Sequence, residues 1–411
     1  AQIVSPQDQR IQYEGIAAGP IATLPRMGFE DAKAAGLLIA FDETLEARYL
    51  EALDTQCQGP VPPPAQVRAV TTALHGVGHR WVEAALNRRG FSDLHPVIAQ
   101  AEPDGAFPTV TFPNPEEPGA LDLALELGEK VDADLVLAND PDTDRLCVAV
   151  RQTDAVRVLS GNELGVLLGD WLLRNRRAKG TAGSDPFLAT TIVSTTMLRA
   201  VAEASDATCI QTLTGFKWIW DRALSRIAKG GTFVFGFEEA LGYCVGEVVR
   251  DKDGVGAAQI LMELAADLKS QGRTLLDQLE TLYRAHGVYL NRQVSVRLPG
   301  LDGRARIDGL MAGLRSAPPG EISGVAVTEM SDLSGPDAEA LGLPRSNVIV
   351  LRLADGSRVV VRPSGTEPKL KSYLEVREAV SLDEEVAEAR RRAEPRMAEL
   401  VTWIDRVIGG S

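Results

Sequence analysis

Three aspartates stand at alternate positions of one short segment, residues 140–145, which reads Asp-Pro-Asp-Thr-Asp-Arg. When ionised, the carboxylates of Asp140, Asp142 and Asp144 would repel one another at this spacing. A hard divalent cation would remove the repulsion, and Mg²⁺ prefers carboxylate oxygens as ligands. The segment therefore predicts a magnesium site.

Calcium loops of the EF-hand type also space acids at alternate positions, but they require Gly at position six and Glu at position twelve. Here those positions hold Arg145 and Arg151, which disfavours a calcium loop. A solvated acidic turn without a metal is the other explanation. Pro141 restricts its own backbone and that of Asp140, which favours a tight loop.

A second candidate site lies at residues 362–369, which read Arg-Pro-Ser-Gly-Thr-Glu-Pro-Lys. Arg362 offers a guanidinium fork, Ser364 and Thr366 offer hydroxyls, and Gly365 leaves backbone N–H groups accessible. These groups together suit a phosphate. An ordinary Pro/Gly turn between two strands explains the same residues equally well.

Two further segments carry charge next to predicted strands or turns. Glu238 and Glu239 follow a predicted strand, and a pair of carboxylates can accept hydrogen bonds from vicinal sugar hydroxyls. Acids of a turn that serve only structure are the alternative. Lys252 stands between Asp251 and Asp253, a pattern more typical of a solvated turn than of a catalytic site.

Residues 75–78 read His-Gly-Val-Gly between a predicted strand and a predicted helix, as in a dinucleotide-binding loop. The third glycine of that fingerprint is replaced by Trp81, which favours a structural turn.

The elements around these segments alternate between strand and helix patterns. A short apolar strand at 133–138 ends directly before the acidic segment, at the strand end where α/β sheets hold ligands. A strand at 67–74, a helix at 79–88, an extended segment at 96–100 and a helix at 121–131 complete a first α/β unit, for which we expect a parallel sheet.

A related unit follows, with a strand at 187–193, a helix at 197–204 and a strand at 232–235. The C-terminal part differs, because strands predominate at 294–298, 348–353, 357–361 and 372–376 before a long helix at 382–408. We therefore expect two related α/β domains followed by a smaller α+β domain. The predicted boundaries are 64–180, 181–296 and 297–411, preceded by an irregular segment at 1–63.

Composition limits the function classes. The 411 residues are 45% hydrophobic and 24% charged, which is typical of globular proteins, and the net charge of −14 disfavours nucleic acid as a partner. The four cysteines lie far apart, which disfavours a zinc site or a disulfide framework and predicts reduced thiols and a cytoplasmic location. No apolar run approaches the roughly 20 residues of a membrane span.

Taken in order, seven segments resemble the α-D-phosphohexomutase family, which includes phosphoglucomutases and phosphomannomutases. Their order and spacing match the family over roughly residues 64–376. The segments are TTALHGVG from Thr71, DPDTDR from Asp140, TIVSTT from Thr191, TLTGFKWI from Thr212, GFEEALGY from Gly236, VRDKDG from Val249 and RPSGTEPKLKSY from Arg362.

The resemblance implies four domains, three of them related α/β units and the last a smaller α+β domain. It also implies an isomerase that moves phosphate between positions 1 and 6 of a hexose. A phosphoserine would donate its phosphoryl group to a hexose phosphate, form a hexose 1,6-bisphosphate and regain the other phosphoryl group. A monomer or homodimer without nucleic-acid or membrane partners is expected.

Carried over by motif, the resemblance implies a role for each candidate residue. Mg²⁺ would bind Asp140, Asp142 and Asp144; Arg145 would stabilise the transferring group and Lys252 would act as general acid or base; Glu238 and Glu239 would bind sugar hydroxyls; Arg362, Ser364, Gly365 and Thr366 would hold the phosphate that does not react.

The chain departs from the family pattern at two places. Ala240 stands where relatives with a GEES-type loop carry Ser, which leaves the hexose open. The family's phosphoserine loop, T-A-S-H-N-P-like, does not occur in the 411 residues, and Ser5 and Ser194 lack its surroundings. We therefore expect that the chain begins within the first domain and is inactive by itself.

Two other functions remain open at this point. Asp140 could be the nucleophile of a Mg²⁺-dependent phosphatase that forms an aspartyl phosphate. The chain could also be a non-catalytic sugar-phosphate-binding module.

Overall fold

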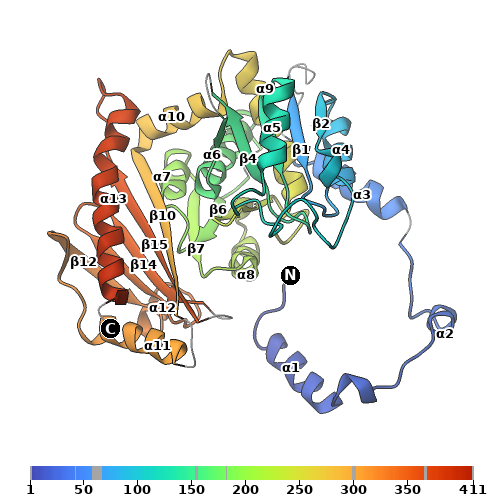
Figure 1. Cartoon of the computed structure of the whole chain (residues 1–411), viewed down its shortest axis with the longest axis horizontal. Helices are drawn as coiled ribbons and strands as arrows, with labels where there is room; N and C mark the ends of the chain where they lie inside the picture. The colour runs from blue at the N-terminus through green and yellow to red at the C-terminus, as the bar shows by residue number, and fades with distance from the viewer. Residues whose placement is uncertain are drawn as a thin grey trace. The chain divides into compact units, whose positions relative to one another are not determined.

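The computed structural model describes residues 2–41, 43–57, 67–152, 156–181, 183–298, 302–364 and 368–409. The chain divides into two compact units (Figure 1). The first unit consists of Ala1–Val158, Phe216–Phe235 and Gly242–Asp267. The second consists of Leu159–Gly215, Gly236–Leu241 and Leu268–Ser411.

The first unit is built around a five-stranded sheet in the order β2-β1-β3-β4-β5. Its strands are β1 (Ala69–Thr72), β2 (Leu94–Pro96), β3 (Leu135–Ala138), β4 (Cys147–Arg151) and β5 (Val156–Val158). The expected parallel sheet is correct for β2, β1 and β3. It is wrong for the rest of the sheet, because β4 pairs antiparallel with β3 and β5 pairs antiparallel with β4. The connection at residues 139–146 is too short for the dozen or so residues of a parallel crossover.

The helices of this sheet agree closely with the sequence pattern. Helix α4 (His79–Arg88) has the predicted bounds, and α5 (Asp122–Val131) begins one residue later than predicted. The extended prediction for 96–100 is wrong at its end, because Ile98–Gln100 form a 3₁₀ helix, η3. That turn directs the buried Gln100 inward, where its Oε1 accepts a hydrogen bond from Thr72 Oγ1 at 2.6 Å.

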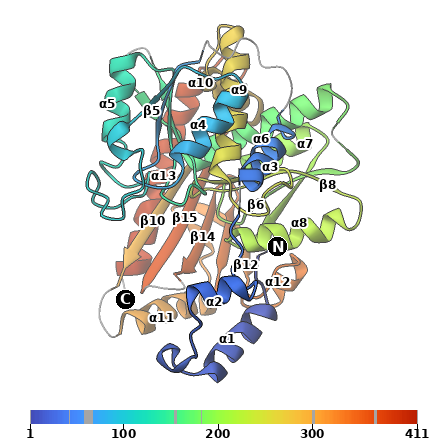
Figure 2. The same cartoon turned by 90° about the vertical axis from the view of Figure 1, so that its right-hand side faces the viewer.

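The N-terminal part of the first unit is helical. It contains α1 (Gln7–Ala18), η1 (Ile21–Thr23), α2 (Phe29–Ala34) and α3 (Glu43–Asp54). The side chains of α1 and α2 are exposed, apart from the half-buried Ala32. Helix α3 instead lies beside α4 (Figure 2), where Tyr49 meets Trp81 edge-on with 5.8 Å between the ring centroids.

Three later elements complete the first unit. They are α8 (Phe216–Ile227), β9 (Gly242–Val245) and α9 (Gly254–Ser270), most of which lies in this unit. Strand β8 (Thr232–Glu238) contributes residues to both units, with Thr232–Phe235 in the first and residues 236–238 in the second.

The second unit begins with an α/β part. It contains α6 (Gly161–Ala178), β6 (Pro186–Thr191), α7 (Met197–Ala204), β7 (Thr208–Thr212) and α10 (Leu275–His286). The helix predicted at 197–204 has these bounds. Strands β6 and β7 pair in parallel, and the end of β8 lies beside β6, where Thr190 Oγ1 donates to the carbonyl of Phe237 at 2.9 Å.

A six-stranded antiparallel sheet forms the rest of the second unit, in the order β10-β15-β14-β13-β12-β11. Its strands are β10 (Val288–Arg297), β11 (Glu321–Ile322), β12 (Val325–Asp332), β13 (Ile349–Leu353), β14 (Arg358–Pro363) and β15 (Lys369–Glu378). Its helices are α11 (Gly303–Ser316), α12 (Pro336–Ala340) and α13 (Val386–Gly409).

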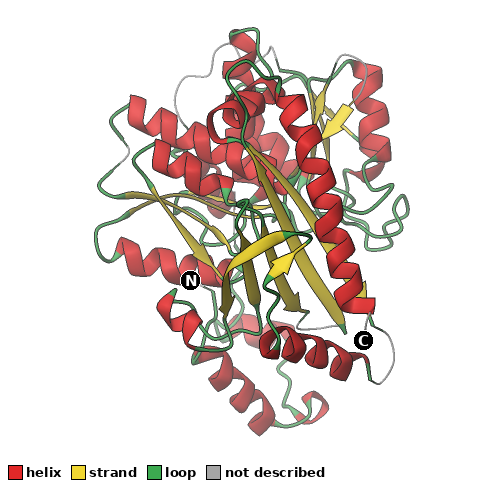
Figure 3. Cartoon of the chain, turned by 90° about the vertical axis from the view of Figure 1, so that its left-hand side faces the viewer, coloured by secondary structure: helices red, strands yellow, loops and turns green. Residues whose placement is uncertain are grey.

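Helix α13 runs along one face of this sheet (Figures 1 and 3). The alternation of side chains along a strand directs Val359 and Val361 of β14 to that face, together with Leu374 and Val376 of β15. They pack in one core with Met397 and other apolar residues of α13. Arg358, Arg362 and Glu375 therefore belong to the opposite face.

Over the described ranges, none of the helices is both long and apolar enough to traverse a bilayer.

Candidate functional site

The acidic segment follows β3 directly and folds back on itself. Asn139 Nδ2 donates to the carbonyl of Arg145 at 2.7 Å, and the Thr143 N–H donates to the carbonyl of Asp140 at 2.9 Å. This compact turn directs Asp140, Asp142 and Asp144 toward one point, and one carboxylate oxygen of each lies within 4.8 Å of the others. The three predicted metal ligands are thus brought together.

Two cations contact this acidic cluster, which we define as Asp140, Asp142 and Asp144. Arg145 Nε donates to Asp140 Oδ2 at 2.5 Å, and the Arg145 N–H donates to Asp140 Oδ1 at 3.0 Å. Lys252 Nζ donates to Asp144 Oδ2. Both predicted catalytic residues therefore lie at the cluster, although Lys252 is 108 residues away from Asp144 along the chain.

The negative charge of the cluster is only partly compensated. Burial raises the pKa of Asp142, and the neighbouring charges of Asp140 and Asp144 raise it further. Burial also raises the pKa of Asp144, and the hydrogen bond from Lys252 only partly opposes this effect. A divalent cation held by the three carboxylates would favour their ionised forms.

The glycine turn before α4 packs directly against the acidic segment. A Cβ on Gly76 would lie 2.2 Å from backbone atoms of Pro141, and one on Gly78 would lie 2.5 Å from Thr143 Oγ1. Thr143 itself has a φ of +64°, which is strained for a β-branched residue. Both glycines thus have a packing reason, as the structural-turn interpretation of residues 75–78 predicts.

A cavity of about 1030 Å³ opens beside the cluster within the first unit. Its lining combines acidic and other polar residues with apolar and aromatic side chains. The lining residues are Phe41, Thr44, Leu45, Glu46, Tyr49, Val77, Trp81, Asp142, Thr143, Asp144, Val249, Lys252, Asp253 and Val255.

Three residues near the cluster were not identified from the sequence. Asn114 Oδ1 accepts a hydrogen bond from Arg145 Nη1 at 3.1 Å. Asp253 accepts from the N–H groups of Val255 and Gly256 at the start of α9 and from Tyr49 Oη at 2.9 Å. Asp253 could have been identified from the sequence because it lies next to Lys252. Asn114 and Tyr49 could not, because only the folded chain brings them near the cluster.

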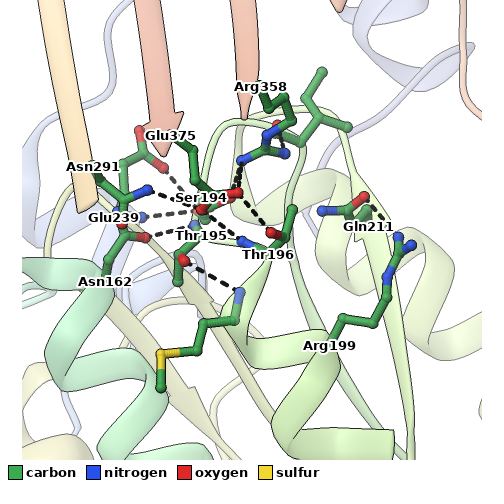
Figure 4. Close-up of polar contacts among 12 residues, drawn as sticks. Asn162, Ser194, Thr195, Thr196, Arg199, Gln211, Glu239, Asn291, Arg358 and Glu375 are labelled. Carbon is green, nitrogen blue, oxygen red and sulfur yellow. Dashed lines mark hydrogen bonds and ion pairs between the residues drawn. The ribbon is translucent and has the colours of Figure 1, made fainter. Parts of the chain in front are cut away.

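The second unit holds the predicted sugar-binding acids at the end of β8, against the turns that follow β6 and β7. Glu238 Oε1 accepts a hydrogen bond from the Gly215 N–H at 2.6 Å. Glu239 Oε2 accepts from Ser194 Oγ at 2.9 Å (Figure 4). It also accepts from Thr191 Oγ1 at 3.3 Å. The two carboxylates are therefore held by different turns of the α/β part.

The predicted phosphate loop is described in part. Arg362 Nη1 donates to Thr214 Oγ1, and the Ser364 N–H donates to the carbonyl of Lys369 at 2.7 Å. Gly365 and Thr366 lie outside the described residues. Because Gly215 binds Glu238 and Thr214 binds Arg362, the turn after β7 contacts both a predicted sugar ligand and a predicted phosphate ligand.

Ser194, which the sequence left as a poor candidate nucleophile, is fully buried and hydrogen-bonded to Glu239. The same turn contacts a buried ion pair between Arg358 and Glu375 (Figure 4), which was not identified from the sequence. The alternation of side chains along a strand could have indicated Arg358, because it stands four residues before Arg362 and therefore on the same face of β14.

The sequence model of one family matches this chain in three successive parts. Its descriptions are phosphoglucomutase/phosphomannomutase α/β/α domain II over residues 47–153, α/β/α domain III over residues 160–285 and the C-terminal domain over residues 325–392. The expected order of two α/β domains and a different C-terminal domain is thereby confirmed.

Curated relatives carry related names. A probable phosphomannomutase of Haemophilus influenzae is 40% identical, and the match covers 92% of this chain and 72% of the relative. A human phosphopentomutase is 37% identical over 92% of this chain and 64% of the relative. A phosphoglucomutase of Staphylococcus epidermidis is 33% identical over 76% of this chain and 58% of the relative.

Solved structures share the fold. Parafusin, a phosphoglucomutase of Paramecium in its open form, superposes with a TM-score of 0.64 at 17% identity, covering 89% of this chain and 62% of that one. A phosphoglucomutase/phosphomannomutase family protein of Burkholderia thailandensis gives a TM-score of 0.59 at 17% identity, covering 85% and 64%. The chain thus spans less than two thirds of both solved structures.

Proposed function

Because this chain belongs to the phosphoglucomutase/phosphomannomutase family, we propose that it is the metal-binding and sugar-binding part of a phosphosugar mutase. The reaction moves a phosphoryl group between positions 1 and 6 of a hexose. The observation that carries the proposal is the acidic cluster, which gathers three carboxylates with Arg145 and Lys252 at the end of a sheet strand. Phosphoryl transfer needs this combination of a metal site and fixed cations.

Asp140, Asp142 and Asp144 would hold Mg²⁺, since three carboxylate oxygens within 4.8 Å of one another suit a hard cation. When bound, the metal ion would supply positive charge next to the transferring phosphoryl group. Arg145, already fixed by Asp140 and Asn114, would add a second positive charge in a set orientation. Lys252 holds a proton at Nζ near the cluster and would act as general acid or base.

The second unit would bind the substrate. Glu238 and Glu239 would accept hydrogen bonds from sugar hydroxyls, while Arg362, Ser364, Gly365 and Thr366 would hold the phosphate that does not react. The shared contact of Glu238 and Arg362 with the 214–215 turn supports this division of the substrate into a sugar end and a phosphate end.

The full reaction would use a phosphoserine and a hexose 1,6-bisphosphate. The 411 residues contain no T-A-S-H-N-P-like loop. We therefore propose that this chain alone binds the sugar phosphate without converting it. Glucose and mannose phosphates are the leading substrates, and a pentose phosphate is a second candidate because the human relative is named a phosphopentomutase.

The alternative of an aspartyl-phosphate phosphatase is less well supported. Both carboxylate oxygens of Asp140 accept hydrogen bonds from Arg145, and Asp140 is 2% exposed. A nucleophilic carboxylate needs one oxygen open to the phosphorus. A non-catalytic binding module would use the same contacts as the proposed mutase part. Addition of a separate polypeptide that carries a phosphoserine loop distinguishes the two, because only the mutase part would then convert the sugar phosphate.

The test is calorimetric titration of the chain with glucose 1,6-bisphosphate, with and without Mg²⁺, while conversion of glucose 1-phosphate to glucose 6-phosphate is assayed. We expect binding without turnover, and weaker binding when Glu238 and Glu239 are both replaced by Gln. The matched control is Glu247→Gln, an exposed acid of the first unit. Turnover by this chain would contradict the proposed need for a serine loop, and unchanged affinity of the double variant would contradict the sugar-binding role.

A further inference from the structure

A buried ion pair crosses two strands of the C-terminal sheet. Arg358 of β14 and Glu375 of β15 are register partners, with 3.4 Å between Arg358 Nη2 and Glu375 Oε1. Their side chains are only 5% and 3% exposed. They lie on the sheet face opposite to α13, the face that also carries Arg362.

Both partners of this pair also bind the turn between β6 and α7, residues 192–196, which we call the serine turn (Figure 4). Arg358 Nη1 donates to the carbonyl of Ile192 at 2.9 Å, and Nη2 donates to the carbonyl of Ser194 at 2.7 Å. Glu375 accepts from the Thr196 N–H at 2.9 Å and from Thr196 Oγ1 at 2.6 Å. The pair thus holds both ends of the serine turn.

The serine turn in turn holds Glu239. Ser194 Oγ donates to Glu239 Oε2 at 2.9 Å and accepts from the Glu239 N–H at 3.1 Å. Its hydroxyl also contacts Thr191 Oγ1 at 2.8 Å. Because Ser194 is fully buried, its hydroxyl has no access to a substrate and acts only through Glu239. A continuous series of hydrogen bonds therefore leads from Arg358 to the carboxylate of Glu239.

Stability alone is a weak reason for this arrangement. A buried ion pair loses the hydration of both charges, and well-packed apolar residues often replace such a pair without loss of stability. Arg358 Nε, moreover, has no hydrogen-bond partner within the described part of the chain. Burial acts to raise the pKa of Glu375, but Arg358 and the hydrogen bonds from Thr196 and Asn291 outweigh it, so that its pKa is lowered and its charge is kept.

We propose that Arg358 and Glu375 are positioning residues for Glu239, which orient its carboxylate through the serine turn. The inference rests on the proposed sugar-binding role of Glu239 and extends it. It makes the geometry of a substrate ligand in the α/β part depend on the C-terminal sheet. The same sheet face carries Arg362, so one rigid element would set both the sugar carboxylate and the phosphate ligand.

The test removes the pair without leaving a buried charge. Arg358→Met/Glu375→Leu replaces both side chains by apolar ones. Arg315→Met/Asp332→Asn is the control, an ion pair between α11 and β12 whose described contacts do not include the serine turn. Each variant of the full chain is measured by thermal unfolding, by amide hydrogen exchange and by titration with glucose 6-phosphate in the presence of Mg²⁺.

If the pair positions Glu239, amide exchange at residues 191–197 and 236–241 rises roughly tenfold or more in the folded double variant, while residues 139–146 of the acidic segment stay unchanged. Affinity for glucose 6-phosphate falls roughly tenfold, the scale of a charged hydrogen bond. In a Glu239→Gln background the double substitution causes no further loss, because both changes remove the same interaction.

Unchanged exchange at 236–241 in the folded variant, or additive losses of affinity with Glu239→Gln, would overturn the inference. If the double variant does not fold, Arg358→Lys replaces it, because Lys keeps the charge but lacks the planar fork whose two terminal nitrogens donate to the carbonyls of Ile192 and Ser194. If the wild-type chain does not bind glucose 6-phosphate, the proposed function fails, and the exchange measurement still decides whether the pair orders Glu239.

Discussion

The acidic cluster and the surroundings of Glu239 are two charged sites built in opposite ways. The cluster takes its three carboxylates from five consecutive residues, and Arg145, one of its two cations, follows directly. Glu239 is held by Ser194 and Thr191, which are 45 and 48 residues away in the chain. Ser194 in turn is fixed by Arg358, which lies a further 164 residues on.

Because the two sites are built differently, substitutions in them should have different effects on stability. The acids of the cluster are close in sequence and carry more negative charge than Arg145 and Lys252 compensate, and a bound cation would relieve their mutual repulsion. The charges around Glu239 are paired and deeply buried, so each depends on its partner. We therefore expect substitutions in the cluster to affect metal binding, and substitutions in the buried pair to affect folding.

Glu375→Gln tests this contrast with the largest expected effect. It leaves the Arg358 guanidinium buried without its counter-charge, and breaking a buried pair typically costs about 3–5 kcal/mol of unfolding free energy. Urea unfolding, followed by fluorescence and by hydrogen exchange in β14 and β15, measures the loss. Asp142→Asn is the control, and an equal loss in that variant would remove the contrast between the two sites.

Addition of Mg²⁺ tests the acidic cluster, the other site of the comparison. A ligand that binds only the folded chain, at a hundred times its dissociation constant, stabilises it by about 2.7 kcal/mol. We expect this gain in thermal unfolding of the wild-type chain and its loss in Asp142→Asn/Asp144→Asn. Stabilisation of equal size in that double variant would mean that the cation binds elsewhere.

Arg362→Ala tests the phosphate end of the proposed substrate site. Removal of a charged hydrogen-bond donor is expected to cost roughly 1.5–3 kcal/mol of affinity for glucose 1,6-bisphosphate. Arg345→Ala is the matched control, because Arg345 is exposed and pairs only with Glu339 among the contacts described for the second unit. A much smaller loss in Arg362→Ala would place the phosphate on other residues.

The pH dependence of stability gives the smallest effect. The pKa of Asp142 is raised in the folded chain, so its protonation favours the folded state, and the stability it contributes is present at low pH and lost as pH rises through the folded pKa. Without Mg²⁺, lowering the pH from 7 toward the ordinary Asp pKa of 3.8 should favour the folded state of the wild-type chain relative to that of Asp142→Asn, measured as the difference between their melting temperatures. Equal shifts of the melting temperature in both proteins would show that the pKa of Asp142 is not raised in the folded chain.

Local patterns predicted much of the fold. The apolar periods of α4 and α7 predicted their bounds, and the acidic segment was expected directly after a strand, where it lies. Neither β4 nor β5 was among the predicted strands, and periodicity reports burial, not the sense of pairing, so the antiparallel part of the sheet was missed. The 3₁₀ turn ending at Gln100 was missed, and the hydrogen bond that holds the Gln100 side chain comes from Thr72, 28 residues away, beyond the reach of a local pattern.

The sequence by itself determined which residues carry the charge of this protein and that three aspartates share a small volume, because side chains within five consecutive residues of a tight loop cannot move far apart. Only the tertiary structure decided which charges meet over long distances. Lys252 reaches Asp144, and Arg358 with Glu375 reaches the serine turn, because folded strands bring distant segments within hydrogen-bond range. The alternation of side chains along a strand can assign a residue to one face of a sheet, but the element that packs on that face depends on the packing of the whole unit.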